Sequence, residues 1–219
     1  LVGVATVGFR RTHDHPPSTP SGQGRPPSRR PLLREALAGT HTLFAFYVLA
    51  NLDALIARNR LDAHDAGLYA AGLILTKAAL MAPSFVGVLL YPRFATDETA
   101  ASLRRGVTVV AAVGLVATVA TALLPEVALI LAGGRQYAEI SDRLWLFTLV
   151  GSIWSIVQVL VLGSLARRTT GVSILIWAAV ITLPVLVVIT SVNVTGLIIL
   201  VGMVGAALSL VLSFSPRAR

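Results

Sequence analysis

The chain has 219 residues, of which 55% are hydrophobic and only 13% are charged, and its mean hydropathy is +0.80. A soluble domain is roughly 45–50% apolar and about 25% charged, so this chain has too little polar surface for a soluble globule. It contains no cysteine, which excludes disulfides and thiolate metal sites. The composition therefore predicts an integral membrane protein.

The N-terminal part of the sequence divides into two segments of different composition. Residues 1–9 are apolar but too short to cross a membrane, and we expect them to be the tail of a preceding, truncated helix. Residues 10–35 contain six of the eleven prolines and many arginines. Such a segment cannot bury enough apolar surface to offset the entropy lost on ordering, so we expect a flexible cytoplasmic loop.

Six apolar stretches follow, and each is long enough to cross a hydrocarbon core of about 30 Å. They cover residues 36–57, 66–91, 106–124, 144–165, 171–191 and 194–213, and residues 214–219 form a short tail. Strands are excluded because an open sheet edge in lipid would leave backbone groups without hydrogen-bond partners. We therefore expect an all-α integral membrane protein, with a bundle of six transmembrane helices over residues 36–213.

The arginines predict how these helices are oriented. Cytoplasmic loops of membrane proteins carry an excess of Lys and Arg. With the proline-rich loop on the inside, thirteen cations are cytoplasmic and four lie outside, the latter being Arg58, Arg60, Arg135 and Arg143. The net charge of +8 is then mainly an orientation signal, and a nucleic-acid partner is excluded because the cations are divided among short loops. We expect a multi-pass protein of the cytoplasmic (inner) membrane with its C-terminus in the cytoplasm.

Two ionisable residues fall within the expected spans, where charges are costly and commonly functional. Asp53 lies near the outer end of the first span, and Lys77 lies near the middle of the second, about 10 Å deeper. They could lock two helices together as a charge pair, or they could line a hydrated cavity inside the bundle. Aromatic residues near span ends are typical of interface anchors, and here these are Tyr69, Tyr91 and Trp145.

The sequence contains no arrangement typical of an enzyme or of a cofactor site. The histidines are scattered between loops and opposite faces, at positions 13, 15, 41 and 64. No P-loop, G-x-S-x-G or metal-ligand spacing is present. Glu126 and Glu139 could form an acid–base pair, but solvated loop charges are the simpler interpretation. We therefore expect neither catalysis nor a cofactor.

Four short motifs occur in order between the expected spans. Residues 51–58 read Asn-Leu-Asp-Ala-Leu-Ile-Ala-Arg, and residues 66–71 read Ala-Gly-Leu-Tyr-Ala-Ala. Residues 91–94 read Tyr-Pro-Arg-Phe, and Pro-Glu at 125–126 is followed by Gly-Gly-Arg-Gln-Tyr at 133–137. This series resembles the region from the seventh helix to the loop after the ninth helix in Wzx-like polysaccharide flippases. These belong to the MOP superfamily and are related to MATE exporters.

The resemblance implies a fold and a function. The six helices would correspond to helices seven to twelve of a fold built from two six-helix halves. The implied substrate is an oligosaccharide linked to undecaprenyl diphosphate, flipped across the membrane for cell-surface polysaccharide biosynthesis by alternating access. The implied cavity residues are Lys77, Asp53, Asn51 and Arg58, with Lys77 and Arg58 facing the phosphates and Asp53 binding a cation or holding Lys77. The partners would be membrane lipids and an N-terminal half or a second copy of the chain.

Two alternatives remain open from the sequence. A MATE-like cation-coupled drug antiporter would need a cavity rich in carboxylates, and Asp53 is the one carboxylate that the expected spans offer. A non-transporting membrane remnant, left by truncation of a gene, is the other alternative.

Overall fold

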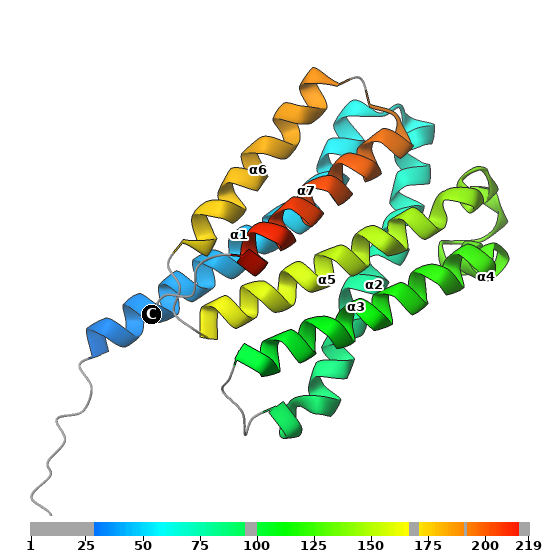
Figure 1. The fold of residues 1–219 in the computed structure, drawn as a ribbon. Helices are drawn as coiled ribbons and strands as arrows, with labels where there is room; N and C mark the ends of the chain where they lie inside the picture. The colour runs from blue at the N-terminus through cyan, green and yellow to red at the C-terminus, as the bar shows by residue number, and fades with distance from the viewer. Residues whose placement is uncertain (1–28, 95–99, 167–170, 191, 215–219) are drawn as a thin grey trace, which may run out of the picture.

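The structure is a computed structural model that describes residues 29–94, 100–166, 171–190 and 192–214. Every regular element in these ranges is a helix, which confirms the expected all-α class for this part of the chain (Figure 1). The long helices are α1 (Arg29–Arg60), α2 (Ala63–Phe94), α3 (Ala100–Leu123), α5 (Leu144–Ala166), α6 (Val172–Ile189) and α7 (Val194–Phe214). Two short elements lie between α3 and α5, namely α4 (Pro125–Leu131) and the 3-10 helix η1 (Arg135–Arg143).

Some expectations fall on residues that the structure does not describe. These are the truncated helix at 1–9, most of the proline-rich loop and the tail from residue 215 onward. The last part of that expected loop is described and differs from expectation, because α1 already begins at Arg29. Pro31 is the third residue of α1, in the first turn, where proline is tolerated, and no further proline occurs before the helix ends at Arg60. The helix can therefore begin ahead of the apolar stretch.

Within the described residues, five helical stretches are long and apolar enough to cross a membrane. They are Gly39–Arg60, Leu103–Leu123, Arg135–Leu165, Val172–Ile189 and Val194–Phe214. The part of the chain that the structure describes thus has five such stretches, one fewer than the six expected, and they indicate a multi-pass membrane protein. The remaining expected span, 66–91, is helical within α2, and its side chains are described only as far as Met81.

The segment between α3 and α5 was expected to be a loop, and it is helical instead. Pro125 occupies the start of α4, where its missing N–H costs no helical hydrogen bond. The helix ends where Gly133 and Gly134 adopt φ angles of 120° and 98°, a conformation that favours glycine. Their N–H groups donate to Ile130 O at 3.3 Å and to Leu129 O at 2.8 Å, which satisfies the last carbonyls of α4. The chain can then turn into η1.

Helix α5 is the centre of the bundle. It packs against α3, α2 and α7, whereas α6 packs against α1 and α7. Figure 1 shows α3 and α6 on opposite flanks. The span containing α5 is 56% buried, against 17% for the span of α3 and 22% for that of α6. The flanking helices therefore present apolar side chains outward, as lipid-facing helices do.

Small and hydroxyl-bearing residues allow α2 and α5 to approach closely. A Cβ atom added at Gly151 would lie 2.3 Å from the carbonyl oxygen of Thr76, so only glycine fits there. The Thr76 hydroxyl donates to Phe147 O at 3.0 Å, and the Ser155 hydroxyl donates to Ala79 O at 2.8 Å. Without a hydrophobic driving force between helices in lipid, such close packing and hydrogen bonding hold the helices together.

Candidate functional site

Asp53 lies on α1 at its contact with α2, and its side chain is only 2% exposed. Its Oδ1 accepts a hydrogen bond from the Ala54 N–H at 2.9 Å, and its Oδ2 accepts one from the Tyr69 hydroxyl at 3.3 Å. A buried carboxylate is costly unless such donors compensate for the water it has lost. The sequence predicted that Asp53 is important, and the structure adds that a tyrosine hydroxyl holds it.

Tyr69 was expected to be an interface anchor, and this prediction is wrong. Its side chain is fully buried, and its ring packs edge-to-face on Phe147 of α5 with centroids 5.3 Å apart. Asp53 and Tyr69 are each eight residues from Leu61, which lies in the turn between α1 and α2. Residues equidistant from the turn of an antiparallel helical pair lie at the same depth, so the sequence contained a signal for this contact.

Lys77 lies two turns further along α2, and its side chain is partly buried. Its Nζ donates to the carbonyl oxygen of Ala50, which is three residues before Asp53 on α1. Within the described residues, Lys77 and Asp53 form no ion pair closer than 4.0 Å. Side chains of a helix lean toward its N-terminus, so Lys77 reaches back toward the turn and bonds to the backbone next to the carboxylate. Instead of the Asp53–Lys77 charge pair that the sequence allowed, Lys77 bonds to the backbone carbonyl of Ala50, three residues before Asp53.

The other two expected cavity residues, Asn51 and Arg58, lie apart from this cluster. Asn51 is exposed, and its Nδ2 donates to Tyr47 O within the same helix at 2.7 Å. Arg58 is exposed near the end of α1 and has no ion-pair partner among the described residues. A displacement of two residues turns a side chain by about 200° around a helix, which separates Asn51 from Asp53. We call the remaining group, Asp53, Tyr69 and Lys77 with the Ala50 carbonyl, the α1–α2 charged cluster.

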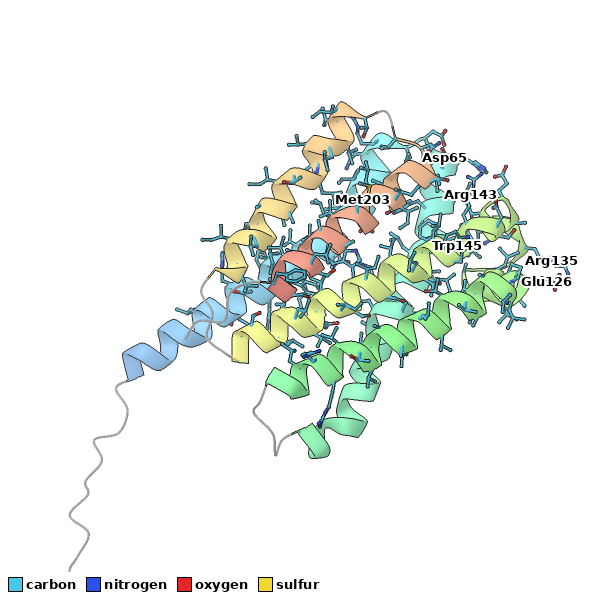
Figure 2. All side chains as sticks on the ribbon, in the orientation of Figure 1. Asp65, Glu126, Arg135, Arg143, Trp145 and Met203 are labelled. Atoms are coloured by element: carbon cyan, nitrogen blue, oxygen red, sulfur yellow. The ribbon has the colours of Figure 1, made fainter. Side chains whose placement is uncertain are left out.

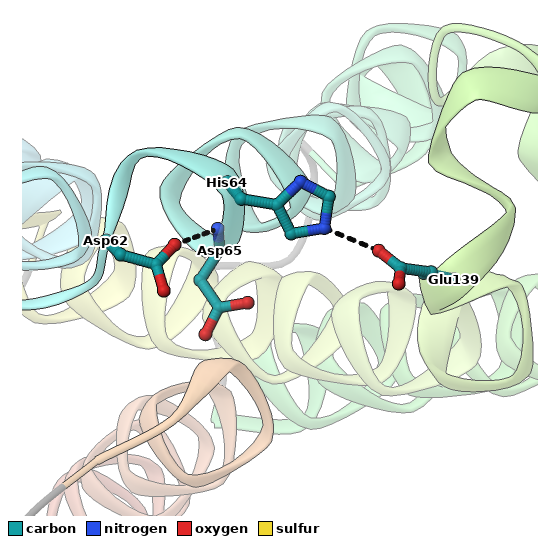
Figure 3. Close-up of polar contacts among 4 residues, drawn as sticks. All are labelled: Asp62, His64, Asp65 and Glu139. Atoms are coloured by element: carbon teal, nitrogen blue, oxygen red, sulfur yellow. Dashed lines mark hydrogen bonds and ion pairs between the residues drawn. The ribbon is translucent and has the colours of Figure 1, made fainter.

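A second polar group connects α2 to η1 at one end of the bundle (Figure 3). His64 Nε2 lies 2.5 Å from Glu139 Oε2, and Asp62 Oδ1 caps the start of α2 by accepting from the Asp65 N–H at 2.8 Å. The Glu139 carboxylate raises the pKa of His64, first through this hydrogen bond and then through its charge. Glu139 is exposed, as expected of a solvated charge, and its pairing with a histidine 75 residues away is a contact that the sequence did not predict.

Charged side chains gather at this end of the bundle. Figure 2 shows Asp65, Glu126, Arg135 and Arg143 there, with Trp145 a little further in. Arg135 and Arg143 belong to the four arginines that are expected outside the cell from the arginine distribution. Trp145, which is expected to be an interface anchor, is exposed next to them.

A groove with a volume of about 410 Å³ lies beside the N-terminal part of α3. It is lined by Arg104, Arg105, Thr108 and Val109. Both arginines are exposed, and neither forms an ion pair with another described residue. The groove therefore offers two guanidinium groups close to the point where the span Leu103–Leu123 begins.

The chemistry available at the α1–α2 charged cluster is that of ion binding. An ammonium group has three donors, and one N–H of Lys77 is occupied by the Ala50 carbonyl. The described residues contain no group of three or more metal-ligating side chains.

Comparisons of the chain with protein-family models, with curated proteins and with solved structures find no match. We therefore infer a function from the geometry of the charged residues within the helical bundle.

Proposed function

We propose that the chain is part of a membrane transporter that flips a lipid-linked oligosaccharide across the cytoplasmic membrane. In this proposal its long helices correspond to helices seven to twelve of a Wzx-like flippase fold, and α2 is the sixth helix that crosses the membrane. The observation that carries the proposal is Lys77, a partly buried cation at the contact between α2 and α1 whose Nζ donates to the Ala50 carbonyl. A purely structural helix contact has no need of an ammonium group at that depth.

The α1–α2 charged cluster also joins two of the motifs on which the resemblance depends. Asp53 comes from the Asn-Leu-Asp motif, and Tyr69 comes from the Gly-Leu-Tyr motif that follows the turn. Their hydrogen bond supports the view that both motifs serve one site. Lys77 would attract the diphosphate of the lipid carrier as a point charge, with the two N–H groups that do not bond to Ala50 as donors.

The remaining cations suggest a route for the diphosphate. In the orientation expected from the arginine distribution, the Arg104–Arg105 groove faces the cytoplasm, where the carrier lipid is loaded. Lys77 then lies within the membrane, and Arg58 lies at the outer end of α1. Alternating access would need a second wall for the cavity, contributed by an N-terminal half or by another copy of the chain.

The test is a flipping assay with a variant that removes only the charge of Lys77. The protein is reconstituted into vesicles with a fluorescent undecaprenyl-diphosphate oligosaccharide, and transbilayer movement is followed together with surface polysaccharide in cells. Lys77→Met keeps the apolar stem, and Arg60→Met, an exposed cation on α1, is the matched control. A hydrogen bond to a charged group contributes about 1.5–3 kcal/mol, so we expect a loss of about 10- to 100-fold for Lys77→Met. Unchanged flipping by this variant at equal protein level would refute the role of Lys77.

A cation-coupled antiporter is the second candidate, and one observation favours it. Asp53 is a buried carboxylate whose two oxygens each accept one hydrogen bond, so lone pairs remain for a cation. A single carboxylate is sparse for this function, which is why we rank it second. Drug resistance that depends on Asp53, without any change in polysaccharide export, would favour the antiporter.

A further inference from the structure

Helix α3 lies on a flank of the bundle and packs on α5 with one face (Figure 1). On this face Leu103 lies against Gly163, and the carbonyl oxygen of Gly114 accepts a hydrogen bond from α5. Successive residues of an α-helix are turned by about 100°, so the residues one and two positions after Leu103 and Gly114 lie on the opposite side. We call this side the outer face of α3. It includes Arg104, Arg105, Thr108, Leu115, Val116 and Val119, which are all exposed.

The outer face of α3 has a charged end and a long apolar part. Arg104 and Arg105 line the groove of about 410 Å³. Beyond the groove the face is apolar, and Leu115 and Val116 are 63% and 69% exposed. Val119 is fourteen residues after Arg105, which is about 21 Å along a helix, whereas the hydrocarbon of one bilayer leaflet is about 15 Å deep. The face therefore has room for a charged headgroup and, next to it, for the length of an acyl chain.

The two arginines of the groove are not paired with a described carboxylate. Neither forms an ion pair with a described residue, and helices α3 and α5 contain no Asp or Glu. The acidic residues nearest in the sequence, Asp97 and Glu98, lie outside the described residues. The Thr108 hydroxyl donates to the Arg104 carbonyl oxygen at 2.9 Å, so guanidinium N–H groups are the donors that the groove offers. The planar fork of a guanidinium matches the oxygens of a phosphate group.

We propose that the Arg104–Arg105 groove binds the phosphate of an anionic phospholipid whose acyl chains lie along the outer face of α3. The two arginines favour a headgroup with net negative charge over phosphatidylcholine, because choline adds a cation beside the phosphate. In the orientation expected from the arginine distribution, the groove lies in the cytoplasmic leaflet, whose surface carries anionic lipids. The occupant is then a resident membrane lipid and not the cargo, so the inference is separate from the transport proposal.

The test measures which lipid lies next to the outer face of α3. The chain has no cysteine, so Ala112→Cys places a single fluorophore at an exposed position on this face, two turns beyond Arg105. The full chain is reconstituted in phosphatidylcholine vesicles with a minor share of brominated phosphatidylglycerol, which quenches a fluorophore that it touches. Ile181→Cys on α6 is the matched control, because positions 112 and 181 each lie nine residues after the start of their spans.

The expected result is a local enrichment of phosphatidylglycerol. One cation near an anionic membrane surface strengthens attraction by about fivefold. With two arginines, quenching at position 112 should correspond to an enrichment of about 5- to 30-fold over phosphatidylcholine, with little enrichment at position 181. No enrichment at position 112, or equal enrichment at both positions, would overturn the proposal.

Charge variants in the Ala112→Cys background show whether the arginines cause the enrichment. Arg104→Gln with Arg105→Gln should reduce it to the level at position 181, whereas Arg104→Lys with Arg105→Lys keeps both charges and should retain most of it. Arg60→Gln with Arg135→Gln removes two exposed charges at the other end of the bundle and should leave the enrichment unchanged. Undiminished enrichment in the first variant, or complete loss in either of the others, would refute the assigned site.

Competition identifies the occupant. Unbrominated phosphatidylglycerol should relieve the quenching, and an equal share of undecaprenyl diphosphate should relieve it no more strongly. Stronger relief by undecaprenyl diphosphate would overturn the choice of a resident phospholipid and leave the transport proposal standing. An excess of inorganic phosphate should have no effect, and relief by it would show that the acyl chains contribute nothing. The flipping assay of Lys77→Met has no bearing on these results, so the two proposals can fail separately.

Discussion

Gly151 marks the closest approach of α5 to α2, and we expect Gly151→Ala to destabilise the bundle. The added Cβ would lie 2.3 Å from the Thr76 carbonyl oxygen, whereas ordinary contacts begin at 3.4 Å. The helices must therefore separate by about 1.1 Å, which strains the Thr76–Phe147 and Ser155–Ala79 hydrogen bonds.

The size of the effect follows from two opposing contributions. Overpacking costs about 1–3 kcal/mol, and the two interhelical hydrogen bonds contribute about 0.6 kcal/mol each. Alanine gains about 1 kcal/mol over glycine in a helix, so we expect a net loss of about 1–3 kcal/mol in the free energy of unfolding.

The measurement is unfolding in detergent micelles or bicelles, followed by circular dichroism, with Gly67→Ala as the matched control. Gly67 is also helical, but an added Cβ meets no atom within 4 Å there. The control keeps the gain in helix propensity without the clash, so it should be neutral or stabilising. The reasoning would be refuted if Gly151→Ala were as stable as Gly67→Ala.

Two further predictions concern the polar groups of α2. Tyr69→Phe removes one hydrogen-bond donor to the buried Asp53 and keeps the ring on Phe147, so the free energy of unfolding should fall by about 1–3 kcal/mol. The control is Tyr47→Phe at an exposed position, which should change the free energy of unfolding little. Glu139→Gln should lower the pKa of His64 toward its ordinary value of 6.5. An NMR titration of the His64 ring measures this pKa, and equal titration midpoints in the parent protein and the variant would contradict the pairing. Because the folded-state pKa of His64 is raised, the stabilisation from this pair should be full below the unfolded pKa and lost as the pH rises through the folded pKa.

The positions of the long helices could be predicted because membrane insertion depends on length and apolarity alone. Residues 144–165 and 194–213 were expected as spans and lie within α5 and α7. The elements α4 and η1 were missed because they are too short to span, although Pro125 and the Gly133–Gly134 pair are ordinary start and stop signals. A search for spans has no means of detecting them.

The site was predictable only in part. The importance of Asp53 and Lys77 follows from the cost of charge in lipid, and the Asp53–Tyr69 contact could have been found by counting residues from the turn. The acceptor of Lys77 is a backbone carbonyl. Every residue has a backbone carbonyl, so the sequence does not indicate which one accepts the bond. The His64–Glu139 pair depends on how η1 folds back over the start of α2, and no local pattern encodes a contact across 75 residues.

The central position of α5 has a consequence for the order in which the protein is made. Helices α1 to α3 leave the ribosome first, yet the hydroxyl of Thr76 on α2 finds its acceptor in Phe147, 71 residues later. Ser152 of α5 likewise donates to Gly114 on α3, 38 residues earlier in the chain. The hydrogen bonds of α2 and α3 to α5 can therefore form only after α5 has been inserted, whereas α1 and α2 can already join through the α1–α2 charged cluster. Translation of residues 144–166 is then the step at which α2 and α3 gain the helix that both of them pack against.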